Sequence, residues 1–442
     1  MAGVYSERIP ADGSCWDGKA AMHEPYRIKI VESIPRVSPA SRRKALVAAD
    51  YNTFHLDASS VEIDLISDSG TGAMSSDQWS AIAAAREDFS GQDAHARFVA
   101  AGREIFGFEH IQPVHQGRGA ENLLFRLLLE RGDSALSNTF FETTRANIEA
   151  LECRAHDLPD ESPPFSGNID IRRLQRTLNE DRRVKLIVIT LTNNVNGGQP
   201  VSLENLIRTR ELADEHGVLL ALDASRFAGN AALIKQLTGS RRSVKKIARE
   251  FFDLSHLAFL SCKKDGLVNI GGVIAFNDRS LIRPLSHEII RQESYPSAGG
   301  LAARDLVAMA VGLSEAVDDR VVLDHVAKVR FLADELLSRG VEVFEPVGAH
   351  GVVIEPPSDL KHAPHALAAA IYLEGAVRVG VFEHSVRLAI PRRVYTRDHL
   401  THVADVVDRA RRRKPIILNC VHNPDEFFNF FARFKPAPGP GR

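Results

Sequence analysis

Apolar and polar positions along residues 184–276 repeat in an order that predicts alternating strands and helices. Apolar side chains, many of them β-branched, fill both faces of VKLIVITLT (184–192), which predicts a buried strand. LENLIRTRELADEHG (203–217) instead has the apolar spacing of a helix and ends at a glycine. Further strands are predicted at 218–225, 257–262 and 271–276. Because strands and helices alternate, we predict an α/β fold with a mostly parallel sheet covered by helices.

The pattern changes near residues 320–330, where a smaller α+β unit is predicted to begin. A long helical segment at 300–319 precedes this change. Proline and glycine dominate the C-terminal segment, which can therefore hold neither helix nor strand. The predicted organisation is an N-terminal arm at 1–25, a large domain at 66–325, a small domain made of 26–65 with 326–434, and a flexible tail at 435–442.

Composition and charge narrow the class of protein. The 442 residues are 44% hydrophobic and 25% charged, as in ordinary globular proteins, and the net charge of −2 argues against a nucleic-acid partner. The first 25 residues lack the apolar core of a signal peptide, and no apolar run reaches the ~18 residues of a membrane span. The cysteines form no metal-type pair and are predicted to be reduced thiols: Cys15, Cys153, Cys262 and Cys420. We expect a cytoplasmic protein without a membrane segment.

Two adjacent lysines follow the strand predicted at 257–262. In Ser261-Cys262-Lys263-Lys264, one amine can form a Schiff base, while the second cation and the hydroxyl can hold a phosphate. Adjacent lysines are more often solvated surface charges, so this motif needs support from elsewhere in the chain.

Two further segments supply that support. Asp223 ends a predicted strand, where a carboxylate can pair with a protonated pyridine nitrogen or can cap the next helix. His115 to Asn122 form a glycine-rich turn that leads into an apolar helix, and such a turn, with Arg118 in it, can bind a phosphate. An amine, a pyridine partner and a phosphate cradle together predict a pyridoxal 5'-phosphate site with Lys264 as its covalent residue.

Eight segments between about Glu24 and Phe434 carry a resemblance to a known family. They are EPYRIKIVE, YNTFHLDASSVEIDLISDSGTGAMS, FGFEHIQPVHQGRGAENLL, NGGQPVSLENL, KKDGLVNIGG, GGLAARD, EPVGAHG and RLAIPRRVYT. The chain resembles the β-eliminating lyases typified by tyrosine phenol-lyase and tryptophanase. The resemblance implies a pyridoxal-phosphate fold type I (aspartate aminotransferase-like), with a large and a small domain. It also implies a homodimer or homotetramer with active sites at the subunit interface.

The resemblance further implies roles for single residues around the cofactor. Lys264 would form the Schiff base, Asp223 would pair with the pyridine nitrogen, and Arg226 would lie near the ring oxygen. Phe141 would stack on the ring. The remaining contacts to the cofactor would come from Gln116, Gly117, Arg118, Asn194, Ser261 and Lys263.

Substrate and cation sites are implied in the same way. The α-carboxylate of an amino-acid substrate would be bound by Ser69, Asn194 and Arg392, since a guanidinium fork suits a carboxylate. A potassium site would consist of Glu87, Asn269 and the backbone of Gly70, although Glu87 could equally form an ordinary ion pair.

The departures from the family pattern lie on the leaving-group side. Phe89 stands where the family has a tyrosine that assists the departing aromatic ring, and a phenyl group cannot donate a proton. Glu142, after Phe141, could be a substitute acid if its environment raised its pKa, or simply a charged residue on a loop rim. Asn429, beside Phe430, replaces a phenylalanine or histidine of the family.

Three other differences concern the same region. Ala298 takes the place of a tyrosine, and residues 376–384 connect almost directly to Val386, where the family has a longer excursion. His350, in Gly348-Ala349-His350-Gly351, is either a substitute acid or a structural hydrogen-bonding histidine.

We therefore expect a lyase that abstracts the α-proton of an amino acid and eliminates a β-substituent, giving aminoacrylate and then pyruvate and ammonia. With Phe89 in place of the tyrosine, the general acid that assists the departure of phenol or indole is missing. Loss of one general acid commonly lowers the rate by a factor of ~10²–10⁴, so we expect another leaving group. β-Substitution or retro-aldol chemistry in specialised metabolism is the alternative, and a non-catalytic cofactor-binding relative ranks below both.

Overall fold

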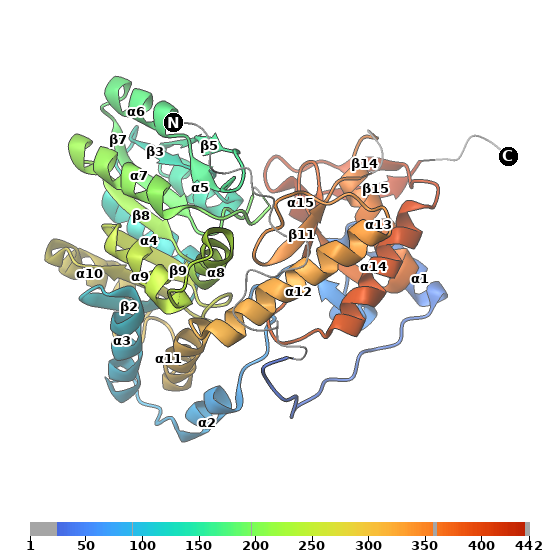
Figure 1. The fold of residues 1–442 in the computed structure, drawn as a ribbon, viewed down its shortest axis with the longest axis horizontal. Helices are drawn as coiled ribbons and strands as arrows, with labels where there is room; N and C mark the ends of the chain where they lie inside the picture. Colours follow the sequence, from blue (N-terminus) through green and yellow to red (C-terminus); the bar gives the residue numbers. More distant parts are fainter. Residues whose placement is uncertain (1–23, 91, 196, 357–359, 438–442) are drawn as a thin grey trace.

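The computed structural model describes residues 24–437 apart from 91, 196 and 357–359. Two layered units lie side by side in it, joined by the long helix α12 (Asp319–Ser338), as Figure 1 shows. The larger unit is built on a seven-stranded sheet and the smaller one on a four-stranded sheet.

The large sheet has the strand order β2-β10-β9-β8-β7-β3-β4. Its ladders are parallel except those of β10, which runs antiparallel to both of its neighbours, so the prediction of a mostly parallel sheet is confirmed. The strands are β2 (His110–Val114), β3 (Ser134–Ser137), β4 (Arg154–Asp157), β7 (Val184–Thr190), β8 (Leu219–Asp223), β9 (Leu257–Ser261) and β10 (Gly272–Phe276). β5 (Pro159–Asp160) and β6 (Asn168–Ile169) form a separate short pair.

Both faces of this sheet are buried, because successive side chains of a strand point to opposite faces. Leu186 and Val188 of β7 pack with α4 (Gly117–Leu128), α5 (Glu142–Glu149) and α10 (Ile282–Gln292). Ile187 and Ile189 belong to the larger core on the other face. The helices of that core are the first part of α12 together with α3 (Gln92–Phe106), α6 (Ile171–Glu180), α7 (Leu203–His216), α8 (Phe227–Thr238), α9 (Val244–Asp253) and α11 (Ala303–Ala316).

Local signals set the ends of these helices. The Ser202 side chain accepts a hydrogen bond from the Asn205 amide at the start of α7, and Gly217 ends the helix with φ at 65°. α11 begins at Ala303, later than the predicted residue 300, because Asp305 caps it by accepting from the Ala302 amide at 3.0 Å. α2 (Ser76–Ala84) packs on α11 and begins with a capping box.

The smaller sheet draws its strands from distant parts of the chain, in the order β1-β12-β13-β11. β1 (Ile63–Leu65) runs parallel to β12 (Val377–Val381), and β13 (Val386–Ala389) pairs with β12 and with β11 (Gly351–Ile354). Its helices are α1 (Pro39–Ala48), α13 (Ala363–Gly375) and α14 (Arg397–Arg411). Short helical turns cover Thr53–His55, Ala58–Ser60, Arg279–Leu281 and α15 (Phe428–Phe431).

The predictions for the two chain ends need correction where the structure describes them. β15 (Arg433–Pro436) pairs with β14 (Leu418–His422), so the first residues of the predicted tail belong to a strand. Glu24, in the predicted arm, lies 3.5 Å from the buried Lys328 of α12, beside the Tyr26 ring. The predicted parts at 1–23 and 438–442, with Cys15, lie outside the described residues.

Among the described residues, no helix combines the length and the apolar character that a membrane crossing requires. Cys153, Cys262 and Cys420 are free thiols, as predicted.

Candidate active site

The predicted chemistry-bearing residues gather at one edge of the large sheet. Asp223 is the last residue of β8, and Lys264 lies just beyond β9. β8 and β9 are parallel neighbours, with Asp223 opposite Phe259, so both carboxyl ends reach the same edge. In α/β sheets this edge is where ligands bind.

A phosphate-sized cradle lies at the start of α4. Gln116 caps this helix without a side-chain hydrogen bond, which leaves the first backbone amides free for an anion. A Cβ on Gly117 would lie 2.8 Å from the Cβ of Ser261 and 3.1 Å from its amide nitrogen. Only glycine therefore lets α4 approach the end of β9 this closely, and the structure brings the two predicted phosphate segments together.

Asp223 is held in one orientation by a serine pair. Its Oδ1 accepts from the Ser225 hydroxyl at 2.7 Å and from the Ser225 amide at 3.2 Å. The Ser225 hydroxyl in turn accepts from the Ser261 amide at 3.1 Å. Within the described part of the chain, these contacts leave Oδ2 for a pyridinium nitrogen, so the residues fit the cofactor.

Lys264 is a buried amine that feels the negative charge of Asp223. Burial lowers its pKa to about 8, helped by the positive charge of Arg226 and opposed by Asp68, Asp223 and Glu121. Its Nζ makes no hydrogen bond or ion pair with the described residues. A partly deprotonated, unpaired amine is what covalent attachment to an aldehyde needs.

Glu121 is a site residue that the sequence interpretation missed. Burial and the negative charge of Asp223 raise its pKa to about 7, while hydrogen bonds from Thr144 and Asn147 act in the opposite direction. Thr144 Oγ1 donates to Glu121 Oε1 at 2.8 Å, which links α4 to α5. Its place in α4, one helical turn after Gly117 and so on the same face of the helix, was the available signal.

Four charged residues, Asp68, Arg226, Asp265 and Arg392, form a buried network beside Lys264. Arg226 binds Asp68 through two hydrogen bonds of 2.7 and 3.0 Å. Arg392 donates to Asp68 at 2.9 Å and to Asp265, whose Oδ2 caps α8 by accepting from the Ala228 amide at 2.8 Å. Burial raises the pKa of Asp68, but the charge and hydrogen bonds of Arg226, together with the charge of Arg392, outweigh it and hold that pKa well below its usual value.

This network changes the interpretation of two predicted residues. Nη1 and Nη2 of Arg392 already donate to Asp68 and Asp265, so these two nitrogens are not free to bind a substrate carboxylate. Arg226 likewise donates from Nε and Nη2 to Asp68, and its place near a ring oxygen stays a prediction. In this chain both arginines hold the site together.

The free guanidinium belongs to Arg387 on β13, which the sequence interpretation did not single out. Nη1 donates to Asn194 Oδ1 at 2.6 Å, the group lies 4.7 Å over the Phe382 ring, and Nε has no partner. Burial lowers its pKa to about 10, with a further contribution from Arg226. No acidic side chain among the described residues pairs with it. An arginine inside the apolar strand VRLA was the signal, because a buried charge needs a partner.

The predicted cation ligands do not form one cluster in the chain. Asn269 Nδ2 donates to the Gly70 carbonyl at 2.8 Å, so these two are in contact. Glu87 instead caps α11 by accepting from the Ala303 amide at 2.8 Å. Ser69, next to Gly70, hydrogen-bonds through its amide to Ser67 at 3.1 Å. The potassium site stays a prediction from the resemblance.

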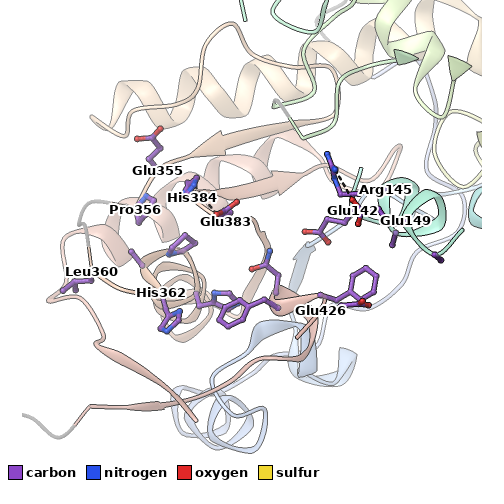
Figure 2. Close-up of a pocket in the computed structure, with 18 residues that line it drawn as sticks. Glu142, Arg145, Glu149, Glu355, Pro356, Leu360, His362, Glu383, His384 and Glu426 are labelled. Carbon is purple, nitrogen blue, oxygen red and sulfur yellow. Dashed lines mark hydrogen bonds and ion pairs between the residues drawn. The ribbon is translucent and has the colours of Figure 1, made fainter. Parts of the chain in front are cut away.

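The residues predicted on the leaving-group side of the site lie in two separate places. Glu142 and Asn429 both line a cavity of about 1150 Å³ between the two units, and Figure 2 shows Glu142 in its wall. Phe89 lies on the linker between α2 and α3 with 79% of its surface exposed, and its ring contacts Tyr295 at 5.8 Å. It is no part of this cavity, so in this chain it does not face Glu142.

Other predicted neighbours of the site have clear places. Phe430 packs on Phe54 at 4.8 Å, and Ala298 is buried. His350 is buried 3.5 Å from Arg387, and burial, with the charge of Arg226, holds its pKa well below the usual value. A histidine that stays neutral beside a guanidinium fits the structural interpretation of His350.

Comparisons with known proteins agree with this geometry. The family described as "Beta-eliminating lyase" matches residues 64–406. A tryptophanase from Salinibacter ruber is 41% identical and covers 93% of this chain and 95% of its own. A tyrosine phenol-lyase from Pasteurella multocida is 37% identical over 93% of this chain and 98% of its own. A serine palmitoyltransferase structure from Sphingomonas wittichii is similar with a TM-score of 0.61 at 12% identity, over 79% of this chain and 87% of that one.

Replacing the central acid of the network should destabilise the protein. In Asp68→Asn, two buried guanidinium groups lose their shared carboxylate, a loss on the order of 3–5 kcal/mol for broken buried pairs. Urea unfolding at pH 7 measures it. Asp253→Asn, which breaks an exposed pair with Arg249, is the control and should change the midpoint little.

The same substitution has a pH signature. A carboxyl whose pKa is depressed in the folded state stabilises above its usual pKa, near 3.8, and loses that contribution as pH falls through the folded value. The gap between wild type and Asp68→Asn should be constant from pH 7 to about 5 and should narrow below about 4. A gap that widens toward acid would contradict the ion-pair assignment.

Proposed function

The chain belongs to the β-eliminating lyase family, and we propose that it removes a β-substituent other than phenol or indole from an α-amino acid. It is a pyridoxal-phosphate-dependent lyase with pyridoxal-phosphate fold type I. β-Elimination is the chemistry of its family, and the nature of the leaving group is our proposal.

The chain's own residues suit the steps around the cofactor. Bound pyridoxal phosphate supplies an electron sink that acidifies the Cα proton of the substrate. Lys264 Nζ, with a pKa near 8, can accept that proton close to neutral pH. Asp223, fixed by Ser225, favours the protonated pyridine nitrogen on which the sink depends. The start of α4 holds the phosphate end in place.

Arg387 is the carboxylate anchor that we propose in place of Arg392. Its Nε is unpaired and it has no acidic partner among the described residues. Asn194 orients one end of the guanidinium and Phe382 covers one of its faces. A substrate carboxylate would supply the missing negative charge through two parallel hydrogen bonds.

The observation that supports a different leaving group is the composition of the cavity wall. Phe89 carries no acidic proton and lies outside the cavity, whereas Glu142 lines it. Burial raises the pKa of Glu142, against hydrogen bonding from Asn429 and the charge of Arg118. We therefore propose Glu142 as the acid that protonates a departing group, one that needs less acid assistance than phenol or indole. Assembly as a homodimer or homotetramer, potassium binding and a cytoplasmic location stay predictions.

A substrate comparison tests the leaving group. With purified holoenzyme, S-propyl-L-cysteine should give pyruvate with a kcat at least about 10² above those for tryptophan and tyrosine, because an alkyl thiolate needs less acid assistance. Lys264→Ala should abolish the reaction. Faster release of indole or phenol than of propanethiol would overturn the proposal, and an aldehyde product would favour retro-aldol chemistry.

Substitution of the carboxylate anchor should act on substrate binding. Arg387→Lys should lower kcat/KM about 10²-fold, mainly through KM, because an ammonium cannot form the two parallel hydrogen bonds of a guanidinium. Steady-state pyruvate formation measures this effect, with the exposed Arg413→Lys as control. If Arg392 were the anchor, Arg392→Lys would raise KM while Arg387→Lys left it unchanged.

Substitution of the proposed acid should depend on the leaving group. Glu142→Gln should reduce kcat with S-propyl-L-cysteine by about 10²–10⁴, and much less with an S-aryl cysteine whose thiolate is electron-poor. Glu180→Gln, an exposed glutamate on α6, should behave as wild type. Equal losses for both substrates would show that Glu142 does not act as the acid.

A further inference from the structure

The cavity beside Glu142 is larger and more polar than a site for a small apolar group requires. It lies between α5 of the large unit and three parts of the small unit: α13, the turn between β12 and β13, and the segment that leads into α15 (Figure 2). Glu142 opens onto it directly after Phe141, the residue expected to stack on the cofactor, and it feels the charge of Arg118 in the phosphate cradle. Glu142 is therefore the lining residue through which the cavity adjoins the predicted leaving-group side of the site.

Carboxylates dominate the wall of this cavity. Besides Glu142 they come from Glu149, Glu355, Glu383 and Glu426, of which Glu383 and Glu426 stand at the rim on the small unit. The short turn at 382–385 is what places Glu383 there. Glu142 is the proposed acid and Glu149 pairs with Arg145, so the negative charge of the wall comes from Glu355, Glu383 and Glu426, which accept hydrogen bonds when ionised.

The one arginine of the wall is already neutralised. Arg145 Nη2 donates to Asp157 at 2.6 Å, and Nη1 donates to the Ala155 carbonyl at 2.8 Å and to Glu149 at 3.3 Å. Its donors point to protein acceptors, so it does not offset the rim carboxylates. A negative field in a concave wall concentrates cations.

A buried histidine provides an independent observation. His365 lines the cavity with only 3% of its surface exposed, and its Nε2 has no hydrogen-bond partner. Burial lowers its pKa to about 4, with a further contribution from His362 and opposition from a hydrogen bond to the Asn429 backbone. A neutral imidazole keeps one ring nitrogen as an acceptor, and Nε2, which has no partner, is available for that role.

These groups fit a donor-rich organic cation better than a metal ion. Within the residues that the structure describes, no three His, Cys, Asp or Glu side chains converge closely enough to hold a metal. Ammonium and guanidinium groups carry several donors on one positive charge and can satisfy dispersed acceptors.

Resting on the proposed elimination, we infer that the substrate's β-substituent carries an ammonium or guanidinium group, which binds among Glu383, Glu426 and His365. For an aminoalkyl thioether, the Cβ–S bond breaks with its electron pair on sulfur, and the thiolate takes a proton from the site. One water completes the reaction, so R–S–CH₂–CH(NH₃⁺)–COO⁻ and H₂O give R–SH, pyruvate and NH₄⁺. The cation on R undergoes no chemistry and serves only recognition.

Two isosteric substrates isolate the charge. S-(2-aminoethyl)-L-cysteine and S-propyl-L-cysteine differ by NH₃⁺ against CH₃ at the end of the same chain. With the holoenzyme at low salt, kcat/KM for pyruvate formation should favour the aminoethyl substrate at least tenfold, roughly the effect of one charge-assisted hydrogen bond. Added salt should reduce this preference, because the rim is exposed. Calorimetric binding of the two ligands to cofactor-free protein should show the same order.

Variants locate the source of the preference. Glu383→Gln combined with Glu426→Gln should lower the preference for the aminoethyl substrate several-fold, through a fall in kcat/KM for that substrate. Glu204→Gln, at an exposed position on α7, is the matched control and should retain it.

The outcomes separate this inference from the proposed function. Pyruvate from the propyl substrate at an equal or higher kcat/KM than from the aminoethyl one would overturn the cationic side chain and leave the elimination intact. Pyruvate from neither substrate would overturn the proposed elimination of alkyl thiolates. A preference that survives in the double variant would overturn the assignment to Glu383 and Glu426.

Discussion

The buried pairing of Asp68 with two arginines is the interaction on which the site depends. Asp68 follows β1 of the small sheet, Arg226 begins α8 of the large unit, and Arg392 follows β13. Arg392 then reaches Asp265, the residue next to Lys264. Three distant parts of the chain are thus fixed around one carboxylate. A fold that buries such charges is stable only when each charge has its partner. The network therefore also specifies how the two units meet.

The charge balance of the site follows from this pairing. Arg226 and Arg392 are neutralised by Asp68 and Asp265, which leaves Arg387 as the buried cation without an acid among the described residues. With Arg387 as the proposed carboxylate anchor, the substrate side of the site would be positive there and negative at the far cavity, where the glutamates gather. An amino acid with a cationic side chain has the complementary order of charges.

Local sequence patterns predicted the sheet, and they selected residues for the cofactor half of the site that lie close together in the structure. β7, β8, β9 and β10 lie where apolar runs predict strands, and Gly117, Asp223 and Ser261 meet as expected. The choice between Arg387 and Arg392 could not be made in this way. Both arginines lie in the short segment RLAIPRR. Only the three-dimensional pairing with Asp68 and Asp265 shows that the Arg392 guanidinium is already occupied. Phe89 poses the same problem, because sequence position identifies the altered residue and says nothing of where its ring points.

α12 gives the enzyme a mechanical link between its two halves. This uninterrupted helix of 20 residues spans about 30 Å from the large unit to the small one (Figure 1). Over that length a tilt of one degree at its base displaces the far end by about 0.5 Å. Arg387 belongs to the small unit and Lys264 to the large one, so the distance from carboxylate anchor to base is set by a lever arm. A small error in the angle of α12 would therefore misplace the Cα atom of the substrate relative to Lys264.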